Sequence, residues 1–125
     1  QSQYGSKDYK SLEEICRKKS KELNLTMEMK QSNVEGEIVD LIQSSRKEFD
    51  GIIINPGAYT HYSYAIRDAI SAIKIDTIEV HLSNIYDREE FRRNSVLKDV
   101  CLKQIVGQGK NGYLLAIRQF IHKTS

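Results

Sequence analysis

The chain has 125 residues and a mass of 14.4 kDa, enough for one domain with a buried core but not for two independent modules. Apolar residues make up 39% and charged residues 29%, with a mean hydropathy of -0.53, which argues against a membrane-embedded or disordered chain. The 19 Lys and Arg residues against 17 Asp and Glu residues give a net charge of +2, too even for a dedicated nucleic-acid-binding protein. We expect a single domain over residues 1–125, with no nucleic-acid or membrane partner.

The first half of the chain predicts two helices and one strand. Residues 1–9 are polar and are expected to form a loop, and the capping box at 11–14 predicts that a helix begins there. Residues 25–30 alternate between apolar and polar with a period of two, which indicates a strand. Ser32 and Asn33 are expected to cap a second helix.

The second half continues the alternation of strands and helices. Short apolar or β-branched runs predict strands at 51–54, 77–82 and 100–106. An apolar stripe predicts a helix after the first of these runs, formed by Ala65, Ile66, Ala69, Ile70 and Ile73. A last helix is expected at 113–121. Such alternation implies a parallel sheet with helices on both faces, and ligands then bind at the carboxyl ends of the strands. That rule directs attention to residues 55–61 and 81–92.

The cysteines indicate the redox compartment. Cys16 falls in a predicted helix and Cys101 in a predicted strand, which favours two reduced, buried thiols in a cytoplasmic protein over a disulfide.

Residues 107–112 match the pattern G-x-G-x-x-G between a predicted strand and a predicted helix. A dinucleotide site also needs a following strand and an acidic residue about 20 residues further on, and the sequence offers neither. We expect these glycines to form a tight turn. No sequence motif for a metal site occurs.

Histidines and arginines near the predicted strand ends are the candidates for chemistry. Glu79 and His81 are two residues apart in a predicted strand, so they point to the same face, and a carboxylate beside an imidazole can make a general acid. The alternative is a surface ion pair. His61 lies near a predicted helix start, where exposed backbone amides favour anions and a neutral imidazole, or it has a structural role. Arg88 and Arg92 are four residues apart and would share one face of a helix, or they belong to a solvated charged surface.

Longer motifs then occur in a fixed order: NPGAYTHYS at 55–63, RDA at 67–69, EVHLSNI at 79–85 and REEFRR at 88–93. On these motifs the chain resembles the type II 3-dehydroquinate dehydratases, and residues 31–37, 107–113 and Tyr4-Gly5 also fit that family. The resemblance implies a flavodoxin-like three-layer α/β sandwich with a parallel sheet, in which residues 1–9 form part of a mobile lid over the active site. It implies an anti elimination of water from 3-dehydroquinate through an enolate, in the shikimate pathway, with no metal or other cofactor and no covalent intermediate.

The resemblance also implies roles for particular residues. Tyr4 matches the phenolate that removes the C2 proton, and His81 matches the acid that protonates the departing C1 hydroxyl. Glu79 orients His81, and Asn55 binds substrate and positions the water that stabilises the enolate. The implied substrate-binding residues are Asn55, His61, Asp68, Leu82, Ser83, Arg88 and Arg92.

Within that set, His61 and Arg92 contact ring hydroxyls, while the backbone amides of Leu82 and Ser83 bind the carboxylate. Asp68 reaches the site of a neighbouring subunit, in an assembly that is a dodecamer built from trimers. Arg88 resembles an arginine near the lid.

The chain departs from the family pattern in two places. Val34 stands where the family usually has histidine, with little expected consequence. Family members also begin with a central strand and a lid arginine ahead of the position of Tyr4. We therefore hypothesise that the sequence is part of a longer protein whose first strand lies between the strands predicted near residues 26 and 52. The 125-residue chain by itself is expected to lack dehydratase activity, because the lid arginine would be lost.

Two other functions stay open. A catalytically silent module on the same fold could bind small anions. A flavodoxin-like nucleotide or receiver domain is disfavoured, because neither an acidic cluster nor a phosphate loop follows the predicted strands.

Overall fold

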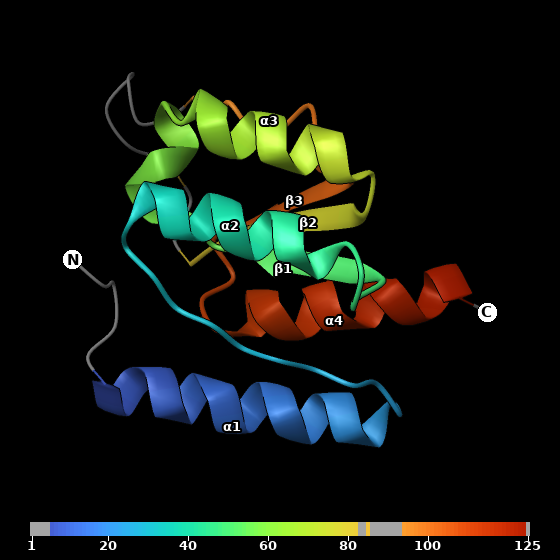
Figure 1. The fold of residues 1–125 in the computed structure, drawn as a ribbon. Helices are drawn as coiled ribbons and strands as arrows, with labels where there is room; N and C mark the ends of the chain where they lie inside the picture. Colours follow the sequence, from blue (N-terminus) through green and yellow to red (C-terminus); the bar gives the residue numbers. More distant parts are fainter. Residues whose placement is uncertain (1–5, 83–84, 86–93, 125) are drawn as a thin grey trace.

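The computed structural model describes residues 6–82, 85 and 94–124 and alternates helices with strands (Figure 1). Its elements are α1 (Ser6–Glu22), α2 (Glu35–Ser45), β1 (Gly51–Ile54), the 3-10 helix η1 (Gly57–His61), α3 (Tyr64–Ile73), β2 (Asp76–His81), β3 (Lys103–Val106) and α4 (Asn111–Thr124). No helix in this described part is both long and apolar enough to cross a membrane.

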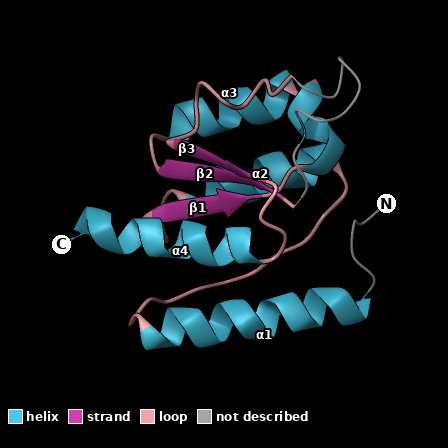
Figure 2. Ribbon diagram, turned by 180° about the vertical axis from the view of Figure 1, so that it is seen from behind, coloured by secondary structure: helices cyan, strands magenta, loops and turns pink. Residues whose placement is uncertain are grey.

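The described strands form one parallel sheet in the order β1-β2-β3. Helices α2 and α3 cover one face, and α4 covers the other with α1 beyond it (Figures 1 and 2). The α/β class and the parallel sheet between helices therefore agree with the prediction.

Strand β2 is the central strand of the described sheet and is buried from Thr77 to His81. Ile78 and Val80 pack against Ala116 of α4 in one apolar cluster. Because side chains alternate along a strand, Glu79 and His81 face the opposite side, where η1 and the segment after residue 93 lie. Glu79 and His81 are thus enclosed within the fold.

The turn after β1 sets the position of η1. The side-chain Oδ1 of Asn55 accepts a hydrogen bond from the Gly57 amide at 3.2 Å, and Gly57 adopts a φ of 61°, in the left-handed region that glycine tolerates. At the far end of η1, Ser63 caps α3 by accepting from the Ile66 amide at 3.1 Å and donates to Glu35 of α2 at 2.6 Å. Both ends of η1 are therefore anchored.

The tight turn predicted from the glycines at 107–112 is confirmed. Gly107 and Gly109 have φ values of 73° and 56°, and their amides donate to the carbonyls of His81 and Leu82 at 3.2 and 3.0 Å. The turn thus covers the carboxyl end of β2.

The strand predicted at 25–30 is wrong. Leu25, Met27 and Met29 are half-buried against α1 and α4 while the intervening residues are exposed, so the alternation itself is present. The segment nevertheless has no strand pairing within the described structure. It does not pair with β1, and the hypothesis of a strand between the two stays a prediction.

Several predicted boundaries are also wrong. Helix α1 begins at Ser6, so residues 6–9 are helical where a loop was expected, and the capping box at 11–14 lies inside the helix. The N-cap of α2 is Val34, without a side-chain cap; the Ser32 hydroxyl accepts from the Val34 amide and donates to Glu37 instead. Strand β3 begins at Lys103, because residues 100–101 form a turn. Ala65, predicted in the apolar stripe of α3, is exposed.

The packing of α4 on β1 predicts that Gly51 tolerates no side chain. A Cβ atom at Gly51 would lie 2.3 Å from Cε1 of Phe120, whereas one at Gly36 in α2 would meet nothing within 4 Å. Gly51→Ala should therefore lower the free energy of unfolding by about 1–3 kcal/mol, measured by urea denaturation. Gly36→Ala is the matched control and should raise it by up to about 1 kcal/mol. Equal effects of the two substitutions would contradict this packing.

Candidate active site

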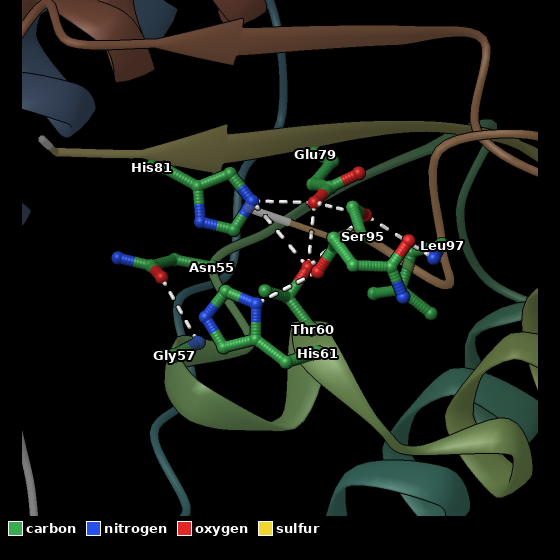
Figure 3. Close-up of polar contacts among 9 residues, drawn as sticks. Asn55, Gly57, Thr60, His61, Glu79, His81, Ser95 and Leu97 are labelled. Carbon is green, nitrogen blue, oxygen red and sulfur yellow. Dashed lines mark hydrogen bonds and ion pairs between the residues drawn. The ribbon is translucent and has the colours of Figure 1, made fainter. Parts of the chain in front are cut away.

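Polar side chains from separate parts of the chain gather where β1 and β2 end (Figure 3). Asn55 follows β1, Thr60 and His61 lie on η1, and residues 94–97 approach from the segment before β3. Because β1 and β2 are parallel, their carboxyl ends lie at the same edge of the sheet, and this edge is where the sequence analysis expected a ligand.

Glu79 and His81 form an ion pair in the interior of this site. Glu79 is 0% exposed and His81 is 5% exposed, and the ring atom Nε2 of His81 contacts Oε2 of Glu79. The two-residue spacing in the sequence predicted that they share a face, and the structure brings them together. The alternative of a surface ion pair is wrong, because both side chains are buried.

Two hydroxyl groups bind the same carboxylate oxygen. Thr60 donates to Oε2 of Glu79 at 2.6 Å, and Ser95 donates to it at 2.8 Å. The two hydroxyl oxygens are 3.3 Å apart, so both lie on one side of the carboxylate. Thr60 is 0% exposed, whereas Ser95 is half-buried.

These contacts determine the charge of Glu79. Burial pushes the pKa of Glu79 up, but hydrogen bonds from His81, Thr60 and Ser95 and the positive charge of His81 outweigh it. The net result is a pKa below the ordinary value for a glutamic acid, so Glu79 is a carboxylate at neutral pH.

The ionised carboxylate also orients the imidazole. A carboxylate only accepts hydrogen bonds, so Nε2 of His81 must carry the proton that points at Glu79. The other ring nitrogen, Nδ1, lies on the edge of the ring turned away from Glu79 (Figure 3). Nδ1 is therefore the His81 atom placed to exchange a proton with a ligand.

His61 and Asn55 lie on the same side of the site as Nδ1 of His81 (Figure 3). Nδ1 of His61 is 2.7 Å from the carbonyl oxygen of Asn94, which can only accept, so this nitrogen is the protonated one. The amide group of Asn55 is held by the Gly57 backbone. Both side chains are thus oriented by backbone groups.

The remaining predicted residues divide into two groups. Leu82 directly follows β2, and its carbonyl accepts a hydrogen bond from the Gly109 amide. Asp68 is exposed on α3. The predicted residues outside the described part of the chain are Tyr4, Ser83, Arg88 and Arg92.

Thr60 and Ser95 are the site residues that the sequence analysis missed. Thr60 lies inside the motif at 55–63, beside His61, which was considered because it is a histidine near a predicted helix start. Ser95 follows a run of charged residues and carries no spacing signal. Only the folded arrangement shows that both hydroxyls converge on Glu79.

Other features of the structure lie apart from this site. A cleft of about 370 Å³ is lined by Lys74, Asp76, Thr77 and Cys101, among others, at the opposite, amino end of β2. Cys16 and Cys101 are free thiols, and Cys16 is buried as expected, whereas Cys101 is only half-buried. No group of three or more His, Cys, Asp or Glu side chains in the described ranges is placed to hold a metal ion.

The lowered pKa of Glu79 predicts a pH-dependent contribution to stability. A carboxylate whose folded pKa is depressed stabilises the protein above its unfolded pKa, and that stabilisation is lost as the pH falls through the folded value. Glu79→Gln should therefore be less stable than the wild type at pH 7, by about 3 kcal/mol, and the gap should narrow below about pH 4. Urea denaturation of both proteins at a series of pH values measures this. A gap that stays constant would contradict an ionised, stabilised Glu79.

Comparison with known proteins identifies relatives of the chain. The sequence profile of a family described as "Dehydroquinase class II" matches residues 1–121. A curated 3-dehydroquinate dehydratase of Caldicellulosiruptor saccharolyticus is 59% identical over 115 residues, covering 91% of this chain and 79% of the relative. One from Clostridium beijerinckii is 52% identical over 116 residues, covering 92% of this chain and 80% of the relative.

Solved structures similar to this chain also come from dehydroquinases or dehydroquinase-like proteins. The crystal structure of a type II dehydroquinase from Butyrivibrio crossotus is similar with a TM-score of 0.87 and 51% identity, covering 91% of this chain and 79% of that one. A 3-dehydroquinate dehydratase-like protein from Bifidobacterium longum has a TM-score of 0.80 at 33% identity, covering 95% and 89%. On profile, sequence and structure together, the chain belongs to the class II dehydroquinase family.

Proposed function

We propose that this protein dehydrates 3-dehydroquinate to 3-dehydroshikimate, by an anti elimination of water through an enolate, as a hydro-lyase of the shikimate pathway. Membership of the family over residues 1–121 supports the reaction. The observation that carries the residue roles is the buried Glu79–His81 pair at the carboxyl end of β2. The proposal calls on no cofactor.

In the proposed reaction, Tyr4 acts as a phenolate and takes the proton from C2 of the substrate, and the electron pair left behind forms the enolate. The enolate then expels the hydroxyl group at C1 as that carbon–oxygen bond breaks. His81 donates a proton from Nδ1 to the departing hydroxyl, which leaves as water. Glu79 supports this step because its negative charge stabilises the protonated imidazole. The role of Tyr4 rests on the family motif.

The substrate-binding roles follow from the same edge of the sheet. Asn55 is proposed to bind substrate and the water near the enolate oxygen, and its anchoring by Gly57 supports a fixed orientation. His61, held by the Asn94 carbonyl, is proposed to contact a ring hydroxyl together with Arg92. The backbone amides of Leu82 and Ser83 are proposed to bind the substrate carboxylate.

We further propose an assembly in which sites are shared between subunits. The proposed form is a dodecamer built from trimers, in the cytoplasm, with Asp68 of one subunit reaching the site of the next. The exposure of Asp68 on α3 supports this role, since the side chain is accessible to a neighbour. Arg88 is proposed to lie near the lid that residues 1–9 help to form.

The acid role of His81 predicts a large loss of rate. His81→Ala, made in the protein at its natural full length, should lower kcat by about 10²- to 10⁴-fold, because the leaving hydroxyl loses its proton donor. Tyr4→Phe should lower it by a similar factor, because the base is removed. The enone absorbance of 3-dehydroshikimate measures both.

His122→Ala is the matched control, since it removes the third histidine from the last turns of α4 and should leave kcat unchanged. An active parent whose kcat hardly changes in His81→Ala and in Tyr4→Phe would remove both role assignments. A parent protein that binds 3-dehydroquinate in calorimetry without turning it over would support the anion-binding alternative instead.

A further inference from the structure

The two oxygens of the Glu79 carboxylate have very different surroundings. Oε2 accepts from Nε2 of His81, from Thr60 at 2.6 Å and from Ser95 at 2.8 Å. Oε1 is buried and has no hydrogen-bond partner within the described residues. The polar contacts seen for this carboxylate therefore converge on the oxygen that faces His81.

The hydroxyls of Thr60 and Ser95 both donate to Glu79. The Ser95 hydroxyl donates to Oε2 of Glu79 at 2.8 Å and accepts from the Leu97 amide at 3.2 Å. Thr60 also donates to Glu79, because a carboxylate cannot donate in return. Both hydroxyls are thus committed to the carboxylate.

The two hydroxyls come from segments that are tied to each other. The carbonyl of Thr60 accepts from the Val96 amide at 2.8 Å, and Arg67 of α3 donates to the Val96 carbonyl at 2.7 Å. His61 contacts the carbonyl of Asn94 at 2.7 Å. The position of Ser95 relative to Thr60 is therefore held by main-chain contacts on both sides.

We propose that Thr60 and Ser95 are positioning residues, whose hydroxyls hold Glu79 ionised and aimed at Nε2 of His81 so that Nδ1 faces the ligand. Figure 3 shows the two hydroxyls on the Glu79 side of the imidazole, away from Nδ1. They act on the reaction through Glu79 and His81 and do not contact substrate. The catalytic part of this inference rests on the proposed function, whereas the effect on Glu79 does not.

Few other titratable groups among the described residues influence the ionisation of Glu79. Among the described residues, His81 on the same strand is the titratable group that acts on Glu79, and Cys101 before β3 is acted on by it. Burial and the charge of Glu79 raise the pKa of Cys101 to about 12, so this thiol stays neutral. Loss of a hydroxyl donor should therefore register directly in the ionisation of Glu79.

The test compares four substitutions. Thr60→Val and Ser95→Ala each remove one hydroxyl with little change of volume, and Thr60→Ser keeps the hydroxyl. Thr77→Val is the matched control, because it removes another buried threonine hydroxyl from the same face of β2 whose bond goes to the Ile75 carbonyl.

The first measurement needs no substrate. In protein carrying ¹³C at the glutamate side-chain carboxyls, with the Glu79 signal assigned through Glu79→Gln, the wild-type signal should remain that of a carboxylate down to acid unfolding. Thr60→Val and Ser95→Ala should each raise its titration midpoint by about one pH unit or more, because a charge-assisted donor is lost. Thr60→Ser should restore most of the wild-type behaviour, and Thr77→Val should match it. Midpoints that do not move in Thr60→Val or Ser95→Ala would overturn the proposal.

The second measurement uses 3-dehydroquinate and the natural full-length protein. In Thr60→Val and Ser95→Ala the acid side of the kcat profile should move to higher pH with the Glu79 midpoint, and kcat at neutral pH should fall on the order of tenfold, with KM little changed. A merely structural role would lower stability without moving the pH profile, and that outcome would overturn the catalytic part. Absence of turnover in the wild type would refute the proposed function alone, because the Glu79 titration decides the hydroxyl roles independently.

Discussion

The structure depends on one buried negative charge. A carboxylate that is removed from water is costly unless hydrogen-bond donors and a positive partner replace the water. Glu79 lies fully buried in β2, and its donors come from three places: its own strand, the helix η1 and the segment at 94–97. The hydrogen bonds that the Glu79 carboxylate accepts therefore hold three parts of the chain in one arrangement. The candidate active site is the product of that requirement.

The sheet explains how those donors reach Glu79. Parallel strands end at the same edge, so the chain that leaves β1 crosses above the end of β2. The turn at 55–57 brings the chain round at once, and η1 places Thr60 over Glu79. On the far side of β2, the glycine turn after β3 binds the carbonyls of residues 81 and 82. The short connections therefore enclose Glu79, while Nδ1 of His81 remains on the opposite edge of its ring.

Each sequence pattern predicted only the structural property that it depends on. The two-residue spacing of Glu79 and His81 reports which face of a strand they share, and that interpretation is confirmed. The alternation at 25–30 reports one-sided burial, which is present, but carries no information on backbone pairing, so the predicted strand is wrong. Ser11 had the right neighbours for a cap, yet α1 begins at Ser6, and residues 6–10 contain no glycine or proline that would interrupt a helix.

The roles of Thr60 and Ser95 could not be predicted from sequence patterns, for a different reason. Thr60 and Ser95 are 35 residues apart, and the contact between them depends on the route of the chain between α3 and β3. Serine and threonine are common in turns, where they bond to nearby backbone groups, so their presence raises no expectation of a distant partner. The resemblance to a family supplied roles for the proposed acid and base, for Glu79 and for the substrate-binding residues. It supplied none for Thr60 and Ser95, whose hydroxyls donate to Glu79.

The same buried charge also acts on the thiol of Cys101. Burial and the negative charge of Glu79 raise the pKa of Cys101 to about 12, so a second negative charge does not form beside it. His81, by contrast, contacts the Glu79 carboxylate through Nε2 and helps to keep it ionised. The carboxylate thus suppresses a thiolate beside it, while hydrogen-bond donors hold its own charge in place. Because Thr60 and Ser95 donate to that carboxylate, two neutral hydroxyls help to set the electrostatics around His81.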